Sequence, residues 1–344
     1  MFDFRLKLLR TGGVGGLIGL GLAYWPDSAA AHVKWFAPYD VPSQPRVLSR
    51  VLDILFWQPT ALAVAAMLLM CYAERGPIGA ALTRTLDLVS TPFRARIDDL
   101  YRAGTGAFFV ALAVLGGIIL TPELKTDVAQ IRWFQALIAL GMFWRPTMVL
   151  SAIGIAALYV YGVTQYGVFH LLDYPIFLGL AAYLALSGLQ TRLFGMRPLD
   201  VSRWAAGITL IWASVEKWAY PDWTYPLLQS HPEMAMGFGR TYYMDAAGVV
   251  EFTLAFGLLW TPLVRRLSAL VLLGMFVSAI IPFGMIDAVG HLMIIVILIG
   301  IAIDDQPDAL RPPLESVAFF FAALVMDLAA YYGLHAAFFG TLIW

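Results

Sequence analysis

Long apolar runs recur along the whole sequence, and they are the feature that most constrains its fold. A run of about 20 apolar residues is long enough to cross the hydrocarbon core of a bilayer as a helix. The apolar segments lie at 12–31, 51–73, 103–121, 133–143, 147–163, 174–188, 204–220, 246–262, 267–285, 288–303 and 316–336. The sequence therefore predicts an all-α polytopic transmembrane helix bundle of about eleven spans.

The composition agrees with a membrane protein. Hydrophobic residues make up 60% of the chain and charged residues 13%, whereas typical globular proteins contain about 25% charged residues. The net charge of −1 gives no basic surface for nucleic acid, so the predicted surroundings are the lipid bilayer. The single cysteine, Cys71, excludes an intrachain disulfide and any multi-cysteine metal site, and its apolar neighbours indicate a buried residue.

The loop charges predict an orientation. Most of the 22 lysines and arginines fall on one side when the predicted loops alternate across the bilayer. By the positive-inside rule, the N-terminus then lies in the cytoplasm and the C-terminus outside, in the inner membrane of a bacterium. We expect an uncleaved first helix. The alternative is a signal peptide cleaved after Ala31, which would expose His32 as a copper-chelating N-terminus.

Two stretches of the chain align without gaps and predict an internal repeat. QALIALGMFWRP (135–146) matches EFTLAFGLLWTP (251–262), and further along YG (166–167) matches FG (283–284). A parallel duplication of this kind is common among membrane proteins. The predicted organisation has four parts. These are two transmembrane helices with an outer loop and a cytoplasmic interfacial helix (1–101), a first four-helix unit (102–190), a second such unit (203–304) and a C-terminal transmembrane helix (315–344).

Each predicted unit carries an acid and an imidazole at the same outer corner, namely Asp173 with His170 and Asp287 with His291. The spacing of Asp287 and His291 places them on one face of a helix. Glu251 lies about two turns inside its span, where an unpaired charge is costly, and Lys217 or His291 could pair with it. Ionisable groups at membrane depth indicate function. We therefore assign proton chemistry to Glu251, Asp287 and His291, and cofactor binding to His170, Asp173, Glu216 and Lys217.

The histidines are also candidate metal ligands. All five fall on the predicted outer side, and the four best placed to bind a metal are His32, His170, His231 and His291. Imidazole and carboxylate groups suit copper, zinc or non-haem iron, and imidazole can also ligate a haem. No HExxH spacing is present, so any such site must be assembled from different helices. The alternative is that these histidines are hydrogen-bonded at helix ends.

The second unit resembles the DoxX-like family of four-helix membrane proteins. RWAAGITLIWASVEKW (203–218), AGVVEFTLAFGLLWTPLVRRLSAL (247–270) and GHLM (290–293) carry the resemblance, with a weaker copy at 102–190. Relatives include the DoxD-type subunit of thiosulfate:quinone oxidoreductase. The resemblance implies a quinone-facing redox role, with other membrane or periplasmic redox subunits as partners. The chain departs from the single-unit pattern in its length, its flanking helices and its extended outer loops.

Three functions remain open from the sequence. The first is a protein of a redox system whose His and carboxylate groups bind copper, iron or a haem, or handle protons beside a quinone. The second is a transporter that moves a small solute, a metal or protons between two parallel repeats. The third is a non-catalytic membrane subunit or assembly factor. Whether the chain is an enzyme, and which substrate it would act on, does not follow from these residues.

Overall fold

The structure is a computed structural model that describes residues 33–307 and 310–344. Regular secondary structure in these residues is helical, apart from two isolated β-bridges. This confirms the predicted all-α class. The helices are α2 (Val33–Phe36), α3 (Leu48–Val51), α4 (Ile54–Glu74), α5 (Pro77–Arg94), α6 (Ile97–Leu115), α7 (Gln130–Leu140), η1 (Gly141–Phe143), α8 (Met148–Tyr166), α9 (Val168–Leu171), α10 (Pro175–Leu189), α11 (Pro198–Ala219), α12 (Pro221–Ser230), η2 (Pro232–Ala235), α13 (Arg240–Leu258), α14 (Pro262–Ile303) and α15 (Pro313–Phe339).

Four of the described helices are long and apolar enough to cross a membrane, namely α4, α8, α14 and α15. The apolar helix α10 is shorter, at 15 residues. The prediction of about eleven spans is therefore not confirmed, and the first predicted span, 12–31, lies outside the described residues. The predicted spans 267–285 and 288–303 are the two arms of the 42-residue α14, which meet at a kink at Gly284.

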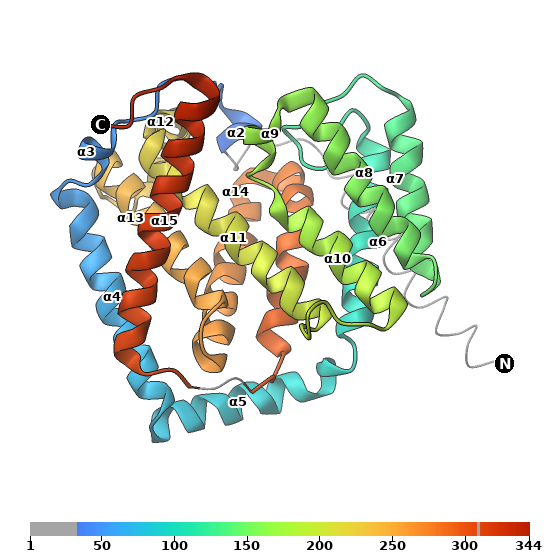
Figure 1. Ribbon diagram of the computed structural model, residues 1–344, viewed down its shortest axis with the longest axis horizontal. Helices are drawn as coiled ribbons and strands as arrows, with labels where there is room; N and C mark the ends of the chain where they lie inside the picture. Colours follow the sequence, from blue (N-terminus) through green and yellow to red (C-terminus); the bar gives the residue numbers. More distant parts are fainter. Residues whose placement is uncertain (1–32, 308–309) are drawn as a thin grey trace.

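The long helices form a bundle that is crossed at one end by α5 (Figure 1). Helices α2, α3 and α12 lie at the opposite end, at the top of the view. Helix α5 exposes large apolar side chains, including Leu88, Val89 and Phe93. An amphipathic helix that lies across the ends of membrane spans fits the lipid–water interface. The interfacial position predicted for a helix before residue 102 stays a prediction.

Ion pairs join α5 to the ends of the helices that it crosses. Arg266 Nη1 of α14 lies 2.8 Å from Asp87 Oδ1 of α5, and Arg94 Nη1 of α5 lies 2.7 Å from Asp305 Oδ2. Next to them, Arg197 Nη2 lies 2.8 Å from Asp304 Oδ2. The same end of the bundle therefore carries three arginines that were predicted to face the cytoplasm, Arg94, Arg197 and Arg266.

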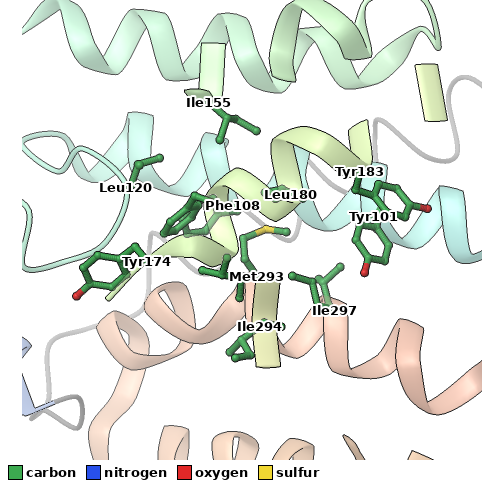
Figure 2. Close-up of a cluster of buried hydrophobic side chains, with 14 of the residues drawn as sticks. Tyr101, Phe108, Leu120, Ile155, Tyr174, Leu180, Tyr183, Met293, Ile294 and Ile297 are labelled. Carbon is green, nitrogen blue, oxygen red and sulfur yellow. The ribbon is translucent and has the colours of Figure 1, made fainter. Parts of the chain in front are cut away.

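A buried apolar core lies between α6, α8, α10 and the second arm of α14 (Figure 2). Tyr101 of α6 and Tyr183 of α10 stack with ring centroids 3.7 Å apart. Met293, Ile294 and Ile297 of α14 face this core from the other side (Figure 2). Close packing is the main source of helix association in lipid, because lipid tails remove the hydrophobic drive between helices. This core fixes the depth of α14 relative to α10.

Two pairs of helices meet through a glycine and a serine in the same way. A Cβ atom at Gly141 would lie 2.0 Å from Ser151 Oγ, and one at Gly257 would lie 2.1 Å from Ser268 Oγ. A side chain at either glycine would therefore collide with the following helix. Small residues at such points allow helix backbones to approach closely.

Two arginines cap helix ends in a matching manner. Arg102 donates from Nε to the carbonyl oxygen of Met142 at 2.9 Å, and Arg203 donates from Nη1 to that of Leu258 at 3.1 Å. The last carbonyl groups of a helix lack partners within it, and an arginine can satisfy them.

The segment between α2 and α4 is tied to the end of the bundle opposite α5. The backbone N–H of Arg46 donates to Ala219 O at 2.8 Å, and that of Leu48 donates to Ile343 O at 2.9 Å. The hydroxyl of Tyr220 donates to Ser43 O at 2.9 Å. These bonds hold the segment against the C-terminal end of α11 and the residues after α15. Helix α2 precedes the segment, and its Trp35 lies in the wall of a cavity.

Candidate functional site

Lys34 of α2 lies at the centre of a buried ion-pair cluster. Its Nζ atom lies 2.5 Å from Asp173 Oδ2 and also pairs with Glu216 of α11. Its side chain is 2% exposed, and its ammonium lies 5.5 Å from the ring centroid of Trp223. Two carboxylates and an aromatic face thus surround one buried cation, an arrangement that offsets the cost of removing the charge from water.

The protonation of Lys34 follows from these contacts. Burial alone would lower the pKa of Lys34, but the negative charges of Asp173, Glu216 and Glu123 outweigh burial and raise the pKa above its usual value. Lys34 therefore stays protonated. On its other side Asp173 accepts a hydrogen bond from Trp212 Nε1 at 2.9 Å, so both of its carboxylate oxygens have partners.

Glu123 and His170 form a second buried pair next to this cluster. His170 Nε2 lies 2.8 Å from Glu123 Oε1, and the hydroxyl of Tyr174 donates to the same oxygen. One ligand atom each from Glu123, His170 and Asp173 lies within 4.8 Å of the other two. A nitrogen and two oxygens at this separation are a donor set that can hold a metal ion.

Asp287 and His291 form the hydrogen-bonded pair that their spacing predicts. His291 Nδ1 lies 3.0 Å from Asp287 Oδ2, and the carboxyl side chain is fully buried. The imidazole packs between Trp35 of α2, with ring centroids 4.9 Å apart, and Phe276, at 4.7 Å. A carboxylate on one ring nitrogen fixes the orientation of the imidazole.

Glu251 of α13 pairs with Lys217 of α11, one of the two partners considered for it from the sequence. Lys217 Nζ lies 2.6 Å from Glu251 Oε2. The Lys217 side chain is 30% exposed and the Glu251 side chain 13% exposed. The pair therefore reaches from the interior of the protein towards its surface.

A cavity of about 290 Å³ joins these groups. Asp173, Glu216, Lys217, Glu251 and His291 lie in its wall. The rest of the wall is largely aromatic and aliphatic, and includes Trp35, Phe177, Trp223, Met275, Phe276 and Ile294. Concave, mostly apolar pockets with a few polar groups are typical sites for small organic molecules.

The structure separates the remaining histidines. His231 lies 3.2 Å from Glu233 near the surface, and His335 contacts the hydroxyl of Tyr220 at 2.8 Å. His32 lies outside the described residues. Of the four histidines predicted to bind a metal, His170 lies beside two carboxylates and His291 lies in the cavity wall.

Three important residues of the site were not predicted from the sequence. Lys34, Trp35 and Glu123 all belong to segments that were predicted as loops. A lysine inside the apolar and aromatic segment VKWF (33–36) was the available signal for the first two, because a solvated loop rarely has that composition. Glu123 follows an apolar stretch, and nothing in the sequence predicts that its loop folds back over His170.

Comparisons of this chain with protein families, with curated proteins and with solved structures find no match.

Proposed function

We propose that this chain is a membrane protein of a redox system that binds a quinone-type molecule in the cavity and exchanges protons with it. One observation carries the proposal: acids and an imidazole converge on a mostly apolar cavity in a chain built for a bilayer. A quinone has a flat apolar ring, two carbonyl oxygens that accept hydrogen bonds and a tail that partitions into lipid. The cavity offers matching aromatic walls and polar groups.

The polar residues of the wall would have two roles, hydrogen bonding to the ligand and proton transfer. His291, oriented by Asp287, is placed to donate a hydrogen bond to a carbonyl oxygen of the ligand and to hold a proton there. The Glu251–Lys217 pair connects the cavity to the surface, because Lys217 is partly exposed. It would serve as the path by which protons reach the cavity. The electrons would come from a partner subunit of the redox system.

The resemblance to the DoxX-like family supports a quinone-facing role. Matching contacts support the duplication into 102–190 and 203–304. The Gly141–Ser151 approach corresponds to the Gly257–Ser268 approach at sequence offsets of 116 and 117. The helix breaks at Gly167 and Gly284, where φ is 86° and 71°, correspond at an offset of 117. Glycine is the residue that adopts such angles without strain.

A titration of the purified protein in lipid nanodiscs with decylubiquinone tests the proposal. Quenching of tryptophan fluorescence would report binding, because Trp35 and Trp223 line the cavity. His291→Ala should weaken binding by about 10- to 100-fold, the value expected for losing one hydrogen bond to an ionisable group. Ala213→Phe, which fills the cavity, should weaken it further.

Two variants outside the cavity serve as controls. His231→Ala removes a histidine near the surface, and Ala330→Phe adds the same bulk as Ala213→Phe on an exposed position of α15. Both should bind decylubiquinone as the wild type does. Equal affinity in His291→Ala, Ala213→Phe and the two controls would contradict the proposed site.

A further inference from the structure

We propose that Glu123, His170 and Asp173 form a second site, which binds a divalent transition-metal ion in competition with the ammonium group of Lys34. This site lies beside the cavity and shares only Asp173 with its wall. It does not depend on the identity of the cavity ligand.

The three ligand groups are held close together by rigid local structure. Glu123 belongs to a loop closed by the N–H of Ile119, which donates to Leu124 O at 2.8 Å. Gln135 of α7 donates from Nε2 to Ile118 O at 2.7 Å and so ties the same loop to α7. His170 and Asp173 are separated by less than one helical turn, on α9 and the turn that follows it.

The donor set suits a transition metal with three protein ligands. One imidazole nitrogen and two carboxylate oxygens lie within 4.8 Å of one another. Metal–ligand distances of about 2.0–2.2 Å would set these atoms about 3.3–3.5 Å apart, which requires only small side-chain movements from their present separations. Mixed nitrogen and oxygen ligands favour zinc, manganese or iron over magnesium and calcium, which prefer oxygen alone.

The charges of the cluster also indicate a cation. Three carboxyl groups, those of Glu123, Asp173 and Glu216, gather around the single ammonium group of Lys34. Burial makes an uncompensated charge costly. A divalent ion would add positive charge where the carboxyl groups outnumber the ammonium.

The ammonium group of Lys34 would compete with the metal ion for Asp173. This ammonium lies 2.5 Å from Asp173 Oδ2, an oxygen of a carboxylate that the metal would use. When a metal binds, Asp173 would exchange the ammonium for the metal, and Glu216 would retain Lys34. Removal of the Lys34 charge should therefore strengthen metal binding, whereas a purely structural ion-pair cluster would give no such effect.

Calorimetric titration of the chelator-treated, full-length protein with Zn²⁺ tests the proposal. We expect one ion per chain, with a loss of affinity of at least about 100-fold in His170→Ala and in Glu123→Gln. Lys34→Met should bind Zn²⁺ at least about tenfold more tightly than the wild type. His231→Ala, which removes a histidine outside the cluster, should bind as the wild type does.

A titration with Co²⁺ keeps the proposal testable if Lys34→Met fails to fold. His170→Cys should retain binding and add a sulfur-to-cobalt charge-transfer band, since the native Cys71 is buried elsewhere. The proposal is overturned if His170→Ala binds Zn²⁺ as the wild type does. It is also overturned if a folded Lys34→Met gains no affinity, or if His170→Cys shows no such band.

Discussion

At the scale of single residues, the close approach of Trp35 to α14 holds α2 over the cavity. A Cβ atom at Gly290 would lie 1.9 Å from the ring of Trp35. The same ring packs against His291. Gly290 is therefore the point at which α2 contacts the wall of the cavity. Lys34 precedes Trp35 on the same short helix and pairs with Asp173.

Gly290→Ala should destabilise the protein by about 1–3 kcal/mol, because the added methyl group overpacks a closely packed site. The matched control is Gly274→Ala on the same helix, where a Cβ would meet no atom within 4 Å. Thermal unfolding in detergent measures both. The cost of Gly290→Ala should fall when Trp35→Ala is also present, because the collision is then removed. Equal costs with and without Trp35 would contradict the contact.

The pairs within the site show which residues the sequence can place. Asp287 and His291 were predicted to interact because a spacing of four residues on one helix is a local property. Lys217 was one of two partners considered for Glu251, because it lies near the end of the preceding predicted span and an unpaired charge inside a span is costly. Lys34 lies 139 residues from Asp173 and 182 residues from Glu216 in the chain. No periodicity reports a contact over such distances, so the centre of the cluster could only come from the structure.

At the scale of helices, α5 depends on charged contacts for its place. Burial would raise the pKa of Asp87, but hydrogen bonds and charges from Arg266 and Arg94 outweigh burial and lower the pKa below its usual value of 3.8. Because the folded protein binds this proton more weakly than the unfolded chain does, protonation favours unfolding. The contribution of Asp87 is complete above the usual pKa and is lost as the pH falls through the lowered value.

Hydrogen exchange of α5 should therefore accelerate as the pH falls below about 4, after correction for the intrinsic exchange rate. Asp87→Asn should show faster exchange in α5 already at pH 7 and a weaker dependence on pH. Asp222→Asn, an exposed residue at the other end of the protein, is the matched control and should behave as the wild type does. Wild-type protection in Asp87→Asn would show that these ion pairs do not hold α5.

The number of spans was harder to predict than the helical class. The apolar runs predict helices because apolar residues dominate them, and the structure places helices in most of them. Hydropathy alone does not separate a helix that faces lipid from one that is buried among other helices. α10 illustrates this limit, because nine of its 15 residues are buried and it is shorter than a typical span.

At the scale of the whole molecule, charge is divided between the two ends of the bundle. The α5 end carries paired arginines. Residues of α2 and α12 line the cavity, and these two helices lie at the opposite end of the bundle (Figure 1). By the positive-inside rule, we propose that the α5 end faces the cytoplasm. The cavity would then lie nearer the opposite face of the membrane.

Cysteine labelling in intact cells tests this orientation. Gln229, at the α12 end of the bundle, and Gln306, near the α5 end, are both exposed. Background labelling should be low because the native Cys71 is buried. Gln229→Cys should react with an impermeant maleimide, and Gln306→Cys should react only after the membrane is opened. The reverse pattern would place the cavity near the cytoplasm.

Photolabelling with an azidoquinone is the most direct test of whether the cavity binds a quinone-type molecule. The purified protein in nanodiscs would be irradiated with the probe, digested and mapped by mass spectrometry. We expect adducts on peptides that cover the cavity wall, within 209–224 of α11 and α12 and 275–294 of α14. These adducts should be lost when decylubiquinone is added in excess. Adducts confined to other helices, or labelling of these peptides that decylubiquinone does not reduce, would contradict it.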